Sequence, residues 1–146
     1  MKEKIVLLFL VALFAAKRLS AQTYANSKQV FEAAEKLKKP ILLIFSGSDW
    51  CMPCIRLKKK VLDDSSFKAY CQEKLLLYTA DFPQKKKLNA EQTKDNELLA
   101  SQFNPKGEFP QVVLIKPDRT VLSTIEASGA TTENWIKTID ALLSKP

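Results

Sequence analysis

The feature that most limits how this chain can fold is a pair of cysteines placed shortly after an apolar segment. Residues 41–45 are all apolar, and a short loop with glycine and serine then leads to the sequence Trp-Cys-Met-Pro-Cys at residues 50–54. A continuous apolar run of this length is typical of a strand that is buried on both faces of a sheet. Pro53 indicates a helix that begins near Cys51, because proline lacks the N–H group that a first helical turn leaves unpaired. The sequence therefore predicts a strand, a loop and a helix, with both cysteines at the beginning of the helix.

Hydrophobic spacing and helix-capping residues predict the remaining elements. Besides the helix that follows the cysteines to about residue 62, we expect helices over 27–38, 67–75, 97–103 and 132–143, and strands over 75–79, 111–115 and 120–126. Residues 83–94 are polar and are expected to form a surface loop or an irregular helix. The last two strands flank a turn sequence with Pro117 and Asp118 and are expected to pair as an antiparallel hairpin. An early parallel crossover and a late hairpin predict an α/β fold, with a mixed sheet of about four to five strands and helices on both faces.

The first 21 residues differ in character from the rest of the chain. Two lysines precede an unbroken apolar run over 5–16, and a small-residue cleavage site follows before residue 22. This is the organisation of a secretory signal peptide, and the run is shorter than the roughly 20 residues that span a membrane. Lys17 and Arg18 favour the alternative of an uncleaved anchor, because charge is unusual between the apolar run and a cleavage site. We expect a signal peptide over 1–21 and one exported domain over 22–146, in a periplasmic or secreted location.

The charge of the chain is moderately positive. The full sequence has 23 basic and 16 acidic side chains, and residues 22–146 retain 19 and 15 of these, a net charge of +4. Lysines cluster at 58–60 and 85–87, but the second run has no interleaved aromatic residues of the kind that nucleic-acid sites use. We therefore interpret the lysines as a solvated face and expect no nucleic-acid partner. Nothing in the pattern requires an oligomer, so a monomer is expected.

The two spaced cysteines are compatible with three kinds of site: structural zinc, covalent haem and thiol redox chemistry. A structural zinc ion takes four ligands, whereas this chain has three cysteines and no histidine. Haem attachment requires a histidine after the second cysteine, and Ile55 stands there. Thiol chemistry remains, and no metal or organic cofactor is expected.

The predicted helix suits thiol chemistry at its beginning. The unpaired N–H groups of a first turn favour the thiolate of Cys51, the form that attacks disulfides. Cys54 lies one turn further on, and Cα atoms at this spacing are close enough for a disulfide. We predict that Cys51 is the exposed nucleophile and Cys54 the shielded resolving thiol. The third cysteine, Cys71, follows Phe67 by one helical turn on an apolar face and is expected to be a buried free thiol.

Three segments together resemble the thioredoxin-like proteins: the apolar strand 41–45, the Trp50-Cys51-x-x-Cys54 motif, and Phe109-Pro110 ahead of a hairpin. A helix that ends directly before the first core strand is most similar to the small exported bacterial members of that family. The resemblance extends from about Ser27 to Ser144. The chain departs from thioredoxins on the strand before the motif, where they carry a buried acid and this chain has Ile44 or Phe45.

The resemblance implies a substrate groove around the cysteines. In this family the proline that matches Pro110 is cis and faces the active disulfide, and the adjacent backbone pairs with the substrate chain. The residues expected to contact substrate are Trp50, Met52, Pro53, Phe109 and Pro110.

The expected function is that of an exported thiol:disulfide oxidoreductase acting on protein disulfides. Cys51 forms a mixed disulfide with the substrate and Cys54 resolves it. The partners are protein thiols or disulfides and a redox partner that the sequence does not identify. The alternative is a thioredoxin-like binding module in which the disulfide is only a structural link.

Overall fold

The computed structural model describes residues 23–145, so the predicted signal peptide over 1–21 lies outside the described residues. The elements in chain order are α2 (Ser27–Leu37), β1 (Ile41–Ser46), α3 (Met52–Leu57), the π-helical turn η1 (Lys58–Leu62), α4 (Ser65–Lys74), β2 (Leu76–Asp81), α5 (Ala90–Phe103), β3 (Gln111–Ile115), β4 (Val121–Ile125) and α6 (Thr132–Leu143). None of the helices within residues 23–145 is long and apolar enough to cross a lipid bilayer.

A mixed sheet with the strand order β2-β1-β3-β4 forms the centre of the fold. β1 runs parallel to β2, with Ile41 opposite Leu76, and antiparallel to β3, with Ile41 opposite Ile115. β3 and β4 form the predicted hairpin, whose turn is closed by a hydrogen bond of 2.8 Å from the N–H of Lys116 to the carbonyl of Thr120. The predicted mixed α/β sheet is therefore confirmed, with four strands in the described part of the chain.

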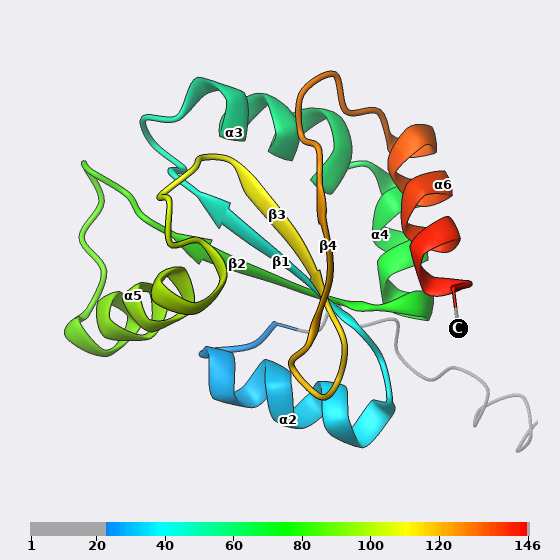
Figure 1. The fold of residues 1–146 in the computed structure, drawn as a ribbon. Helices are drawn as coiled ribbons and strands as arrows, with labels where there is room; N and C mark the ends of the chain where they lie inside the picture. Colours follow the sequence, from blue (N-terminus) through cyan, green and yellow to red (C-terminus); the bar gives the residue numbers. More distant parts are fainter. Residues whose placement is uncertain (1–22, 146) are drawn as a thin grey trace, which may run out of the picture.

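Two apolar cores cover the two faces of this sheet (Figure 1). Leu42 and Ile44 of β1 face the core completed by α3, α4 and α6, whereas Leu43 and Phe45 face the core completed by α2 and α5. All four side chains are at most 1% exposed, so β1 is buried on both faces as its apolar sequence predicts. Burying each such side chain stabilises the fold by about 1.5–3 kcal/mol.

Side-chain caps fix where several helices begin. The side chain of Asn26 accepts the N–H of Gln29 at 3.0 Å ahead of α2, and Thr131 caps α6 in the same way. Asp64 accepts two N–H groups at the beginning of α4. Each cap satisfies donors that a first helical turn leaves unpaired, which confirms the predicted beginnings of α2 and α6.

Two elements differ from the prediction. α5 begins at Ala90, inside the segment expected to form a surface loop or an irregular helix, because Asn89 caps it by accepting the N–H of Gln92 at 2.8 Å. The prediction of a short helix over 97–103 is therefore wrong at its beginning, since the first turns of α5 are polar and show no apolar spacing. The helix after the cysteines reaches residue 62 as predicted, but its last turn, η1, is π-helical.

Candidate active site

The two cysteines lie where the chain leaves the central strand and enters a helix. The carbonyl of Gly47 accepts the N–H groups of Trp50 and Cys51 at 3.3 and 2.9 Å, which closes a tight turn after β1. Cys51 is the N-cap residue of α3, and Cys54 lies in its first turn. The two form a disulfide, with their Cα atoms 5.2 Å apart. The structure thus brings together the pair that the sequence predicts.

Both cysteines are buried, with residue 51 exposed by 4% and residue 54 by 3% of its surface. The prediction that Cys51 is the exposed thiol is therefore wrong in this disulfide form. The physical reason is that Cys51 caps α3 with its own side chain: its Sγ accepts the N–H of Cys54 at 3.3 Å and is bonded to the Cys54 sulfur. Both interactions turn the side chain inward, since Cys54 lies on the buried face of the helix.

The exposed atoms around the disulfide belong to large apolar neighbours. Trp50 is 38%, Met52 57% and Ile55 37% exposed. Pro53 is also exposed and lies in the first turn of α3, where the N–H group that proline lacks would have no partner within the helix. An apolar surface that includes three of the predicted substrate contacts, Trp50, Met52 and Pro53, therefore surrounds the buried disulfide.

Three aromatic side chains from separate segments pack together beside the disulfide. The Nε1–H of Trp50 donates to the carbonyl of Phe82, the residue after β2, at 2.7 Å. The ring of Phe109 lies edge-on to both Trp50 and Phe82, at 5.5 Å between centroids in each case. Such edge-to-face pairs stabilise an arrangement beyond the area they bury. Phe109 therefore contacts Trp50 of the cysteine motif, with which it is expected to form the substrate groove.

The position of Trp50 requires glycine at residue 47. A Cβ added to Gly47 would overlap the indole ring of Trp50. Neither Gly47 nor Phe82 is among the site residues predicted from the sequence. The sequence feature that could have pointed to Gly47 is the rarity of glycine: the chain has three glycines, and one of them precedes the cysteine motif.

The Phe109–Pro110 peptide bond is cis. Pro110 directly precedes β3, whose first residue, Gln111, lies opposite Phe45 of β1. Pro110 and Cys54 line the same cavity, and Phe109, on the other side of this peptide bond, packs against Trp50, which precedes Cys51.

Asp49 fastens the cysteine loop to the loop after β2. One carboxylate oxygen accepts the N–H of Gln84 at 2.8 Å, and the other accepts those of Lys85 and Lys86 at 2.8 and 2.9 Å. These hydrogen bonds, that of Gln84 first, hold the pKa of Asp49 below its ordinary value. The sequence does not reveal this role, because the partners lie more than 30 positions away.

A second carboxylate joins the same two loops. Asp81, the last residue of β2, accepts the backbone N–H and the hydroxyl of Ser48 at 2.9 and 2.6 Å. Asp81 lies opposite Ser46 in the β1–β2 register. The bonds of Asp81 to Ser48 and of Phe82 to Trp50 make this end of β2 one wall of the site.

A cavity of about 590 Å³ extends from the cysteine motif along β2, between the sheet and the helices α3 and α4. Cys54, Pro110, Ser46 and Asp81 line it, and so does Cys71. Ile44 and Phe45, which match the position of the buried acid in thioredoxins, are packed in the two apolar cores. Neither provides a proton acceptor for Cys54.

Cys71 is a buried free thiol, as predicted. Its side chain is 6% exposed, and burial raises the pKa of the thiol to about 12. A thiol with so high a pKa is neutral at physiological pH and is a poor nucleophile. Within residues 23–145, no three side chains of the metal-binding types come together as ligands for an ion.

Comparisons with known proteins agree with this geometry. A family model described as thioredoxin-like matches residues 22–117, the part of the chain from α2 through β3. A solved structure described as DsbH oxidoreductase superposes with a TM-score of 0.78 at 28% identity, covering 87% of this chain and 88% of that one. The fold predicted from the sequence is therefore confirmed.

Two curated relatives come from the bacterium Chlamydia pneumoniae. The disulfide bond reductase DsbH is 39% identical over 101 residues, which cover 69% of this chain and 58% of DsbH. The thioredoxin-related protein DsbJ is 28% identical over 106 residues, which cover 73% of this chain and 30% of DsbJ. This chain thus spans less than two thirds of the length of either relative.

Proposed function

Since this chain belongs to the thioredoxin-like family, we propose that it is an exported thiol:disulfide oxidoreductase that acts on protein disulfides. Cys51 is the nucleophile and Cys54 the resolving thiol. The observation that carries the proposal is their disulfide at the beginning of α3, beside the cis peptide bond before Pro110. A relative named as a disulfide bond reductase and a solved structure described as an oxidoreductase support the same class of reaction.

The reaction exchanges two thiols for one disulfide. In the reducing direction, the Cys51 thiolate attacks one sulfur of a substrate disulfide, and the other substrate sulfur leaves as a thiolate that takes up a proton. The Cys54 thiolate then attacks the Cys51 sulfur and releases the second substrate thiol. The substrate gains two electrons, and the Cys51–Cys54 disulfide must recover two electrons from a redox partner. The relative reduction potentials of the protein and this partner set the direction.

Two features of the site support Cys51 as the attacking sulfur. The N–H of Cys54 points to the Cys51 Sγ, and such a donor stabilises a thiolate more than a neutral thiol. Cys51 also lies ahead of the helix, whereas Cys54 is enclosed against the cavity.

The substrate chain is proposed to lie over the exposed surface next to the disulfide. Trp50, Met52 and Pro53 form one side of this surface, and Phe109 and Pro110 form the other. The packing of Phe109 against Trp50 supports this arrangement, because it joins the two sides. The partners are protein thiols or disulfides and a redox protein, and the working unit is a monomer without a metal or organic cofactor.

Export is part of the proposal. The sequence of residues 1–21 supports it, because its basic start and apolar run have the organisation of a secretory signal peptide. A periplasmic or secreted location would provide the protein disulfides on which the site acts.

One observation favours a second candidate function. Because both cysteines are buried, the alternative role of the disulfide is that of a structural link in a thioredoxin-like binding module. The two candidates differ in whether the disulfide opens and closes while the fold stays intact.

Titration with glutathione buffers separates the two candidates. The fraction of protein with the Cys51–Cys54 disulfide is measured by mass spectrometry after acid quenching, while circular dichroism monitors the fold. An oxidoreductase is expected to change completely between the dithiol and the disulfide with native circular dichroism throughout. A disulfide that stays oxidised until the protein unfolds would establish the structural candidate instead.

A further inference from the structure

The loop after β2 presents three lysines beside the redox site. Lys85, Lys86 and Lys87 are all exposed. Asp49 holds the backbone of this loop through three N–H groups, and Trp50 holds its first residue, Phe82, through the indole N–H. Asp49 and Trp50 directly precede Cys51, so these bonds hold the backbone at Lys85 and Lys86 next to the loop that leads to the disulfide. Figure 1 shows this loop extending from the end of β2 near the beginning of α3.

A second group of cations lies on the outer side of the helix that follows Cys51. Arg56, Lys59 and Lys60 are exposed, and Lys58 between them is already bonded to Asp63 at 2.6 Å. In the part of the chain that the structure describes, none of the other six cations forms an ion pair within 4.0 Å; these are Arg56, Lys59, Lys60, Lys85, Lys86 and Lys87. Their charges are therefore available to a partner.

The carboxylates of the same region do not neutralise these cations. Asp49 is bonded to backbone N–H groups, Asp81 to Ser48, and Asp63 to Lys58 and Lys68. Three carboxylates, Asp49, Asp81 and the exposed Glu108, thus lie in or next to the loops of the site, and none of them forms an ion pair with the six cations within the described residues. We call these six cations the basic rim; Trp50 and Met52, which are exposed next to the disulfide, lie in the chain between Asp49, which binds the lysine loop, and Arg56.

We propose that the basic rim selects protein substrates or partners whose reactive cysteine is flanked by aspartate and glutamate. This inference rests on the proposed function and names its substrate class. Charge complementarity is the argument: opposite charge around a binding surface raises association rates by about 10- to 1,000-fold at low salt. A polypeptide is favoured over other polyanions, because the apolar surface at the centre of the rim and the disulfide beneath it fit a peptide that carries a cysteine.

The test uses three disulfide peptides of equal length, in which the cysteines are flanked by Asp and Glu, by Asn and Gln, or by Lys. The kcat/KM for their reduction by the reduced full chain is measured at ionic strengths of about 0.01 M and about 1 M, where the Debye length is about 30 Å and about 3 Å. At low salt the acidic peptide is expected to react about tenfold faster than the lysine peptide. At high salt the three rates are expected to converge.

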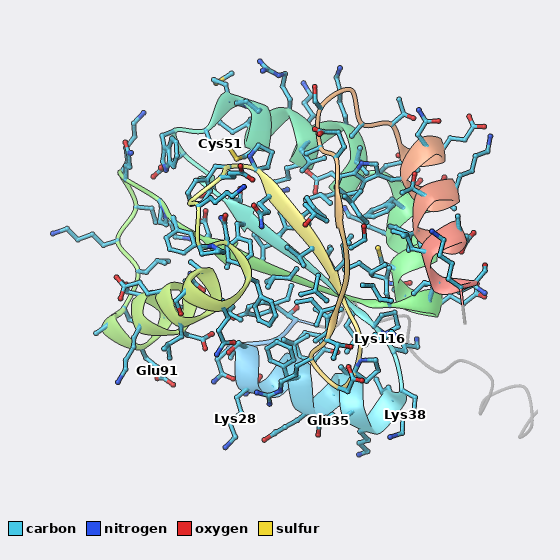
Figure 2. All side chains as sticks on the ribbon, viewed as in Figure 1. Lys28, Glu35, Lys38, Cys51, Glu91 and Lys116 are labelled. Carbon is cyan, nitrogen blue, oxygen red and sulfur yellow. A yellow bond between two sulfur atoms is a disulfide. The ribbon has the colours of Figure 1, made fainter. Side chains whose placement is uncertain are left out.

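Two matched variants test whether the loop lysines cause the preference for the acidic peptide. The loop variant carries Lys85→Gln, Lys86→Gln and Lys87→Gln, which keep the backbone N–H groups that Asp49 binds. The control variant carries Lys28→Gln, Lys36→Gln and Lys116→Gln, which remove the same charge elsewhere. Figure 2 shows Lys28 and Lys116 at the end of the molecule opposite Cys51, and Lys36 lies in the last turn of α2. The loop variant is expected to lose most of the preference for the acidic peptide, whereas the control variant keeps it.

The uncharged peptide separates failure of this inference from failure of the proposed function. If the protein reduces that peptide but shows no charge preference, or if the control variant loses the preference as fully as the loop variant, the inference is overturned and the proposed function stands. If none of the peptides is reduced, both are overturned. Binding of the full chain to vesicles of anionic lipid through the loop lysines, with equal rates for the three peptides, would replace the polypeptide partner by a membrane.

Discussion

The indole ring of Trp50 lies against the α-carbon of Gly47 so closely that no side chain fits at residue 47. This contact holds the indole where its N–H reaches the carbonyl of Phe82 and where its ring forms an edge-to-face pair with Phe109. A residue without a side chain therefore determines how the aromatic wall of the site is built.

Gly47→Ala is expected to destabilise the fold by about 1–3 kcal/mol, because its Cβ must displace the Trp50 ring and its hydrogen bond to Phe82. Urea unfolding measures this change. The control is a double-mutant cycle with Trp50→Ala. In the Trp50→Ala background, Gly47→Ala should lose most of its effect; an equal effect in both backgrounds would show that the ring is not its cause.

Asp49→Asn is expected to release the loop after β2, because the amide offers one acceptor oxygen in place of the two that bind three N–H groups. Hydrogen exchange of the Gln84, Lys85 and Lys86 amides, corrected for intrinsic rates, measures the release. Protection of all three should fall while the core amides of β1 stay protected. Asp118→Asn, at the far hairpin turn, is the control and should leave this loop unchanged.

The same contact predicts a pH dependence. The folded pKa of Asp49 is lowered from the ordinary value of 3.8, so its contribution to stability is fully present above that value. It is lost as the pH falls below 3.8 and through the folded pKa. Loop protection in the wild type should therefore decline in this acidic range, whereas the Asp49→Asn protein should show no such step. A loop that stays protected in acid would mean that the carboxylate does not hold it.

Cys71→Ala is expected to leave disulfide reduction unchanged, because the Cys71 thiol is neutral and buried. The loss of stability should be small, about 1–2 kcal/mol, since this thiol already borders a cavity. Alkylation of the reduced native protein, read by mass spectrometry, should label Cys71 only after unfolding. Rapid labelling of Cys71 in the folded protein would contradict its assignment as an inert thiol.

The sequence predicts those parts of the fold whose causes are local. β1 follows from five apolar residues, and α6 follows from Thr131 and the apolar spacing behind it. The first turns of α5 could not be predicted in this way, because Asn96 on that helix is buried through a hydrogen bond to the carbonyl of Asp81 at 2.7 Å rather than through apolar packing. A polar residue buried by a distant partner leaves no hydrophobic pattern.

The candidate site shows the same difference between features with local causes and features that depend on distant partners. The cysteine pair and Pro110 could be identified from short motifs, whereas the bonds of Asp49 and Trp50 to residues 82–86 depend on how β1 and β2 lie side by side. The burial of Cys51 was missed for a related reason: its side chain caps the helix, and helical spacing alone does not show the direction in which a cap residue points.

Trapping of a mixed disulfide tests the central claim most directly. In a Cys71→Ser background, a protein with Cys54→Ser and one with Cys51→Ser are each incubated with an oxidised protein substrate, and the linked peptides are identified by mass spectrometry. The Cys54→Ser protein should accumulate a covalent complex through Cys51, because the sulfur that resolves it is absent. The Cys51→Ser protein should accumulate little. If both folded variants formed no complex, or if linkage through Cys54 were equally fast, Cys51 would not be the nucleophile of a redox pair.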